Sequence, residues 1–204
     1  MSRGAGDGRL FGANNARDLD IVRAVLGEKQ LNLLGQSYGT YVAAVYGTLF
    51  PARLNRSVLD SAINPQWPWR EAWRQQAIEQ NAVVASDLRM FAEKFPYAWG
   101  AKSAVPQACA FNSRKPIEPL VSPRRSGYPQ GLVVQGEFDP STPYAGGVAM
   151  AAQVDDRLVT VVRDGQHVPY GDNPCVTATV DAYFLEGTLP PVGARCPGGD
   201  PASR

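Results

Sequence analysis

The sequence predicts an α/β fold in which a mostly parallel sheet is flanked by helices. Short apolar runs that are typical of strands alternate with segments of helical periodicity along the 204 residues of the chain. One strand-to-helix junction contains the pentapeptide G-Q-S-Y-G at 35–39. A continuous apolar run at 131–136 is typical of a strand that is covered on both faces of a parallel sheet.

The chain begins with a Gly-rich leader and a predicted helix. The leader covers residues 1–12, and the helical pattern starts at Asn15 and is ended by Gly27. The apolar positions of this helix recur three and four residues apart at Leu19, Val22 and Leu26.

A strand, a tight turn, a second helix and a second strand follow. The first strand covers about 30–35, the helix runs from the pentapeptide to about Phe50, and Pro51 stops it. Residues 56–60 read as the next short strand. Together these elements form a partial α/β core in a first segment, 1–63.

Residues 64–119 predict a shortened helical cap that is inserted into this core. All four tryptophans of the chain fall in this segment. Apolar side chains of this segment approximate one helical face, which is more typical of core packing than of a ligand site. The positions of this face are Trp73, Ala77, Val84, Leu88, Phe91 and Phe95.

The third segment, 120–204, completes the predicted core. A strand at 131–136 leads through a loop into a helix at about 144–154, and the last predicted strand covers 158–162. A final helix then starts after Asn173, which predicts an N-cap with Pro174 in the first helical position. Its expected inner face is Val176, Val180 and Phe184, and Gly187 ends it.

Charge and composition exclude several classes of partner. The chain has 20 basic and 19 acidic residues, which gives no argument for nucleic acid or a membrane surface as a partner. No apolar run approaches the ~20 residues of a membrane span. The N-terminus lacks the apolar core of a signal peptide. The sequence indicates no compartment, no metal and no organic cofactor.

The chain contains three cysteines, an odd number. Cys175 and Cys196 flank the last helix and its tail, and a bridge between them would close a short loop worth roughly 3 kcal/mol in the chain-entropy model. Cys109 would then have no partner. The alternative is three free, buried thiols in a cytosolic protein.

Ser37, at the centre of the pentapeptide, has the surroundings of a nucleophile elbow. In such an elbow the serine occupies a strained turn between strand and helix and presents its hydroxyl above the sheet edge. We expect Gly35 and Gly39 to be required, because a side chain at either position would clash with the neighbouring strand or helix.

A serine hydroxyl is a poor nucleophile at neutral pH, so it needs a base, and the base needs an orienting acid. His167 is the only histidine of the chain and lies in the loop after the strand at 158–162. If a histidine of this chain activates Ser37, it must be this one. The alternative is a surface-loop histidine with no catalytic role.

Asp139 is the favoured acid and Asp60 the alternative. Asp139 follows the strand at 131–136, and its rigid D-P-S-T-P turn directly precedes a helix. Asp60 ends the strand at 56–60. Either aspartate can instead cap a helix or form an Asx turn.

Several stretches carry a resemblance to a known family. The order Ser37, Asp139, His167 is the serine, acid, histidine order of α/β-hydrolases. The chain resembles the bacterial tripeptidyl aminopeptidase and proline iminopeptidase group of these enzymes, which are serine exopeptidases. The matching stretches cover most of 14–197 except the middle, and they are 15–20, 35–41, 46–51, 135–143, 165–167, 173–175 and 187–191.

The resemblance implies an α/β-hydrolase fold in which Ser37 is the nucleophile, Asp139 the acid and His167 the base. It implies no cofactor. The backbone N–H of Tyr38 would be the first donor of the oxyanion hole, and Glu137 is a candidate contact for a substrate ammonium group, with a solvated turn glutamate as the alternative.

The resemblance also implies the Cys175–Cys196 disulfide, and the family is largely exported.

The chain departs from the family pattern in two places. The family has further strands before the elbow strand, and its cap is longer. The loop after one of those strands supplies the second oxyanion donor, and losing one donor costs roughly 10²–10³ in turnover. Without the preceding strands, the elbow strand would be an exposed edge of the sheet, open to self-association or to a complementing chain.

We therefore expect a serine hydrolase that acts like an aminopeptidase and cleaves a peptide or small acyl substrate through an acyl-enzyme. One alternative is a carboxylic-ester hydrolase with the same triad, because the fold does not decide the acyl group. The other is an inactive, truncated remnant or binding module.

Overall fold

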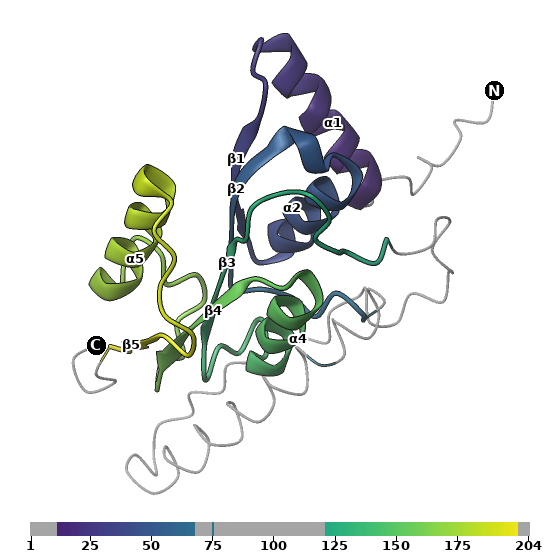
Figure 1. The fold of residues 1–204 in the computed structure, drawn as a ribbon. Coiled ribbons are helices and arrows are strands. Elements are labelled where there is room, and N and C mark those ends of the chain that lie inside the picture. The colour runs from purple at the N-terminus through teal and green to yellow at the C-terminus, as the bar shows by residue number, and fades with distance from the viewer. Residues whose placement is uncertain (1–11, 68–74, 76–120, 200–204) are drawn as a thin grey trace, which may run out of the picture.

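The computed structural model describes residues 12–67, 75 and 121–199. Within this part of the chain, five strands form one parallel sheet in the order β1-β2-β3-β4-β5 (Figure 1). The strands are β1 Leu31–Gln36, β2 Leu54–Asp60, β3 Leu132–Gly136, β4 Arg157–Val162 and β5 Arg195–Pro197. The predicted α/β fold with a parallel sheet is confirmed.

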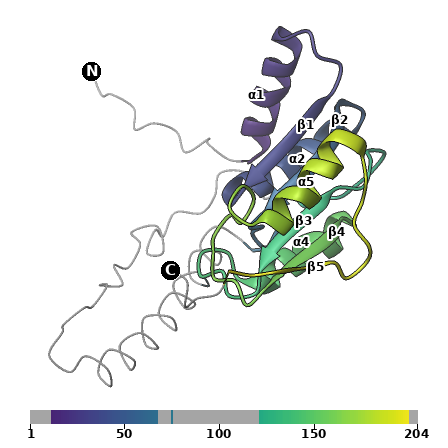
Figure 2. The ribbon, with the colours of Figure 1, turned by 90° about the vertical axis from the view of Figure 1, so that its left-hand side faces the viewer.

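Helices cover both faces of this sheet, which makes three layers. α5 lies on one face, and α1, α2 and α4 lie on the other (Figures 1 and 2). The helices are α1 Gly12–Val25, α2 Tyr38–Leu49, the short 3-10 helix η1 Pro51–Arg53, α4 Tyr144–Val154 and α5 Pro174–Glu186.

The central strands are buried on both sides, as the continuous apolar run at 131–136 predicts. Successive side chains of a strand point to opposite faces. Thus Val134 of β3 packs in the cluster under α5, whereas Val133 packs with residues of α2 and α4. Every residue of β3 is buried.

The first helix begins three residues earlier than predicted and buries a small-residue face. Gly12, Ala13 and Ala16 are its buried residues. Of the positions that recur in its sequence, Leu19 packs against the cluster with α2, but Val22 and Leu26 are 52% and 67% exposed.

β1 is an edge strand of the described sheet, as expected. It pairs with β2, and within the described ranges no strand pairs with its other side. Large apolar side chains are exposed beside this edge, and they are Ile21, Val22 and Val25 of α1, Leu26 just after it, and Leu34 of β1.

The C-terminal region confirms the predicted helix N-cap at Asn173 and the predicted disulfide, and it corrects the number of strands. The Asn173 side chain accepts hydrogen bonds from the N–H groups of Cys175 and Val176 and so caps α5. Cys175 and Cys196 form a disulfide. The strand at 158–162 is not the last, because β5, which carries Cys196, adds beside β4. A three-residue strand that ends in Pro197 has no alternating pattern to reveal it.

The predicted cap at 64–119 lies outside the described residues apart from 64–67 and Gln75, as does Cys109. No helix in the described ranges is both long enough and apolar enough to cross a membrane.

Candidate functional site

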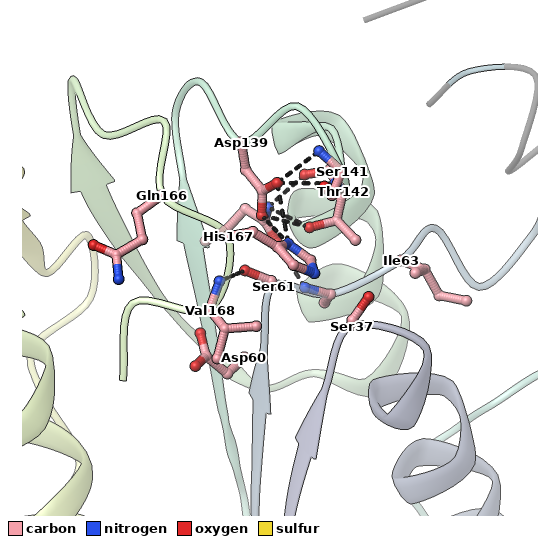
Figure 3. A network of polar contacts seen from close by, with 12 residues as sticks. Ser37, Asp60, Ser61, Ile63, Asp139, Ser141, Thr142, Gln166, His167 and Val168 are labelled. Atoms are coloured by element: carbon pink, nitrogen blue, oxygen red, sulfur yellow. Dashed lines mark hydrogen bonds and ion pairs between the residues drawn. The ribbon is translucent and has the colours of Figure 1, made fainter. Parts of the chain in front are cut away.

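The three residues predicted to form a triad lie at the carboxyl ends of three strands. Ser37 directly follows β1, Asp139 is the third residue after β3, and His167 lies in the loop after β4. Parallel strands end at the same edge of a sheet, so these residues gather there although up to 130 residues separate them in sequence. In Figure 3 the Asp139 carboxylate, the His167 ring and the Ser37 hydroxyl follow one another along this edge.

The backbone of Ser37 has the strained geometry of an elbow. Its φ is 53° and its ψ is −122°, a combination that non-glycine residues rarely adopt and that costs on the order of 1–3 kcal/mol. Three hydrogen bonds hold it there: the Ser37 N–H donates to the Asp60 carbonyl at 3.0 Å, and the N–H and Oγ1 of Thr40 donate to the Ser37 carbonyl at 3.0 and 2.6 Å.

The two glycines of the pentapeptide differ in what they do. A Cβ at Gly35 would lie 2.5 Å from the Gly39 carbonyl oxygen and 2.9 Å from the Thr40 Cα, which the backbone cannot accommodate. A Cβ at Gly39 would meet nothing within 4 Å in the described part of the chain. The expected clash is therefore confirmed at Gly35 and wrong at Gly39.

Asp139 contacts the ring of His167. The Asp139 side chain is fully buried, and its Oδ2 lies 2.9 Å from His167 Nδ1. Its own turn supplies the remaining donors: the N–H groups of Ser141 and Thr142 donate to Oδ1, and Thr142 Oγ1 donates to Oδ2 at 2.7 Å. Because an ionised carboxylate only accepts hydrogen bonds, Nδ1 carries the proton and Nε2 is left as the basic nitrogen.

The electrostatics of this pair favour a charged Asp139 and a more basic His167. Burial alone would raise the pKa of Asp139, but the hydrogen bonds from His167 and Thr142 outweigh it and lower that pKa below its ordinary value. The hydrogen bond to Asp139 raises the pKa of His167 against the opposing effect of its burial.

Ser37 lies near His167 without a direct hydrogen bond to it. No hydrogen bond joins its hydroxyl to the His167 ring among the described contacts, although both side chains occupy the same end of the sheet (Figure 3). Such bonds are often long in enzymes without substrate and tighten only when the substrate is bound.

Asp60, the alternative acid, faces a different partner. Its Oδ2 accepts a hydrogen bond from the Tyr170 N–H at 3.2 Å, and its Oδ1 has no partner in the described structure. The carboxyl is fully buried, and burial raises its pKa to about 7. His167 therefore binds Asp139 rather than Asp60.

A contact that no sequence pattern indicated joins the histidine loop to the end of β2. The Val168 N–H donates to Ser61 Oγ at 2.8 Å, and Ser61 N–H donates to the Val134 carbonyl. Both Ser61 and Val168 have positive φ angles, 56° and 63°. A β-branched residue with positive φ is uncommon, and such strain persists where neighbouring contacts over-determine it.

Two further residues predicted for the site are the oxyanion donor Tyr38 and the substrate contact Glu137. Tyr38 is the first residue of α2, so its backbone N–H lies at the positive end of that helix, and its role as an oxyanion donor stays a prediction. Glu137 accepts hydrogen bonds from the Arg163 N–H and from Arg195, and no described contact joins it to His167. Its role as a substrate contact stays a prediction.

Comparison with protein families divides the chain into two matches. Residues 13–96 match the model described as alpha/beta hydrolase fold, and residues 96–196 match the model described as TAP-like protein.

Within the described ranges, no group of three or more His, Cys, Asp or Glu side chains is placed to hold a metal.

Curated relatives match parts of the chain. Tripeptidyl aminopeptidase of Streptomyces lividans is 56% identical over 70 residues, which is 34% of this chain and 13% of that protein. Carboxylesterase B of Mycobacterium tuberculosis is 39% identical over 123 residues, 56% of this chain and 22% of the relative. The chain thus corresponds to less than a quarter of the length of either relative.

Solved structures share the fold at low sequence identity. VinJ is 18% identical with a TM-score of 0.57, and the match covers 91% of this chain and 75% of VinJ. An alpha/beta hydrolase fold protein from Chitinophaga pinensis is 15% identical with a TM-score of 0.54, and the match covers 87% of this chain and 72% of that one.

Proposed function

Because the chain belongs to the α/β-hydrolases of the tripeptidyl aminopeptidase group, we propose that it is a serine hydrolase with Ser37 as nucleophile, His167 as base and Asp139 as acid. One observation carries the proposal: the only histidine of the chain binds a buried carboxylate at the same end of the sheet where a strained serine follows the elbow strand β1.

In the proposed mechanism His167 Nε2 takes the proton of the Ser37 hydroxyl while Oγ attacks the acyl carbon of the substrate. Asp139 holds the Nδ1–H tautomer and stabilises the imidazolium that forms. The oxyanion of the tetrahedral intermediate would accept a hydrogen bond from the Tyr38 N–H. His167 then gives its proton to the leaving amine or alcohol, and water hydrolyses the acyl-enzyme by the same steps.

For the substrate we propose a peptide cleaved near its free amino terminus. This choice is supported by the match of residues 96–196 to the TAP-like family and by the 56% identity to a tripeptidyl aminopeptidase. A serine protease of Mycobacterium tuberculosis, Hip1, is 44% identical over 64 residues, 31% of this chain and 12% of that protein, and supports the same choice.

Ester hydrolysis by the same residues is the second candidate. The match to carboxylesterase B covers more of this chain than the match to the aminopeptidase does. Turnover of a tripeptide amide with a free amino terminus, compared with turnover of a short-chain ester and of the same peptide with a blocked amino terminus, separates the two. A preference for the ester, or indifference to the block, would remove the aminopeptidase proposal.

Covalent labelling tests the nucleophile before any substrate is known. A fluorophosphonate probe is expected to label the folded protein on Ser37, and the variants Ser37→Ala and His167→Ala are expected to lose the label. Folded protein that takes no label would contradict both hydrolase proposals and favour a non-catalytic binding module.

A further inference from the structure

One buried side chain, Gln135 of β3, connects the turn of the acid to the segment that follows β2. This side chain is fully buried, and both ends of its amide are used. Oε1 accepts a hydrogen bond from the Ala62 N–H at 2.8 Å, and Nε2 donates to the Thr142 carbonyl at 2.7 Å and lies 3.3 Å from Thr142 Oγ1. A flipped amide would place oxygen against oxygen at Thr142, so these partners fix its orientation.

The helix above Gln135 contains a glycine that leaves room for it. A Cβ at Gly147 would lie 2.6 Å from both Cγ and Oε1 of Gln135. Gly147 stands inside α4, where a glycine is less favourable than alanine by roughly 1 kcal/mol. The space at Gly147 allows the buried amide to reach both of its partners.

The two ends of this amide reach two different parts of the site. Thr142 lies in the turn of Asp139 and gives that carboxylate two of its hydrogen bonds. Ala62 follows Asp60 and Ser61, whose carbonyl and hydroxyl accept hydrogen bonds from the Ser37 N–H and the Val168 N–H. The end of β2 therefore holds the nucleophile and the histidine loop directly, and it holds the acid through Gln135.

We propose that Gln135 is a positioning residue: its amide fixes the Asp139 turn relative to the segment that holds Ser37 and the His167 loop. The inference rests on the proposed function, because the placement of Asp139 affects turnover only if His167 serves Ser37. Gln135 has no contact with a reacting atom in this mechanism and acts through Thr142 and Asp139.

Because the chain has a single histidine, the test can be read at His167 itself. In protein labelled with ¹⁵N-histidine, the ring nitrogens report the pKa of His167 without any substrate. The variant Asp139→Asn gives the reference value, which is the pKa of His167 without its charged partner. Gln135→Leu removes both contacts, and Gln135→Met also keeps the length of the side chain but has no N–H to donate to Thr142. In both variants we expect the His167 pKa to move from the wild-type value toward that of Asp139→Asn.

Gly147→Ala makes the same test without changing the amide, because its methyl group would displace the Gln135 side chain. Val148→Ala, at an exposed position of the same helix, is its control. Gln30→Met is the control for the amide, since Gln30 also donates to a main-chain carbonyl, that of Ala52, but at an exposed position outside the site. Neither control should move the His167 pKa.

Activity is the second readout. A misplaced acid should lower the rate of Ser37 labelling on the order of 10–100-fold in the Gln135 and Gly147 variants. A wild-type His167 pKa in folded Gln135→Met and Gly147→Ala would overturn the inference, whatever the rate of Ser37 labelling. If the His167 pKa shifts in these variants but the wild-type protein takes no label, the inference about positioning stands and the proposed hydrolase function is removed instead.

Discussion

Gly35 lies directly beneath the Gly39 carbonyl: a Cβ at 35 would approach that oxygen to 2.5 Å. The β1 strand and the start of α2 therefore meet without a side chain between them. This contact fixes how sharply the chain turns at Ser37, and it explains why the pentapeptide needs a glycine at its first position.

The glycines at 35 and 39 should respond differently to the same substitution. Gly35→Ala is expected to open the elbow and abolish fluorophosphonate labelling of Ser37, or to prevent folding. Gly39→Ala should retain labelling and gain up to about 1 kcal/mol, because alanine is the better helix former and its methyl group meets nothing within 4 Å in the described structure. Labelling and thermal unfolding of the two variants check this. Loss of labelling in a folded Gly39→Ala would contradict it.

The pH dependence of the reaction should reflect the raised pKa of His167. The base must be neutral to accept the Ser37 proton, so kcat/KM should rise with pH through a pKa above the ordinary histidine value of about 6.5. Asp139→Asn removes the main cause of the shift, so its acidic limb should move to lower pH while kcat falls by as much as about 10⁴. A profile with the same limb in both proteins would show that Asp139 does not control His167.

The buried carboxyl of Asp60 should make the fold less stable at neutral pH than at acidic pH. Burial raises its pKa from 3.8 to about 7, so folding favours the neutral form. Its stabilising contribution is complete below about pH 4 and is lost as the pH rises to about 7, by at most about 1.4 kcal/mol for each pH unit.

Asp60→Asn isolates this effect from those of the charged groups that face Asp60, His167 and Asp139. The free energy of unfolding of the variant, measured by urea between pH 5 and pH 8, should rise relative to that of the wild type as the pH increases. A constant difference across this range would mean that Asp60 is already ionised in the folded protein at pH 5, so that its pKa is not raised by folding.

The disulfide should contribute to stability independently of the chemistry of the site. Cys175 and Cys196 are 21 residues apart, and closing a loop of this size stabilises the fold by about 3 kcal/mol. Reduction, or the double substitution Cys175→Ser with Cys196→Ser, should lower the free energy of unfolding by about this amount. Cys109→Ser is the control, and an equal loss in that variant would assign the effect to something other than the bridge.

Sequence alone predicted the parts of the fold that local patterns determine. The elbow at Ser37, the helix at 144–154 and the Asn173 cap each depend on neighbouring residues, and each is found where expected. The pairing of Asp139 with His167 was predictable because the acid has few alternatives and the chain has one histidine.

The contacts that hold the site together were not predictable in this way. Gln135 looks like an ordinary interior residue of a strand, and its partners Ala62 and Thr142 come from different loops. The positive φ angles of Ser61 and Val168 are produced by tertiary contacts, since neither residue type favours that conformation. Such features depend on which loops the sheet brings together.

The open side of β1 has a consequence for the motions of the site. Among the described strands, β1 is hydrogen-bonded along one side only, and it leads directly into Ser37. Amides at such an edge open with a smaller free energy than those of central strands, so β1 should exchange its amide hydrogens faster than β3. The nucleophile is thus attached to an edge strand of the described sheet, while its acid is attached to a central one.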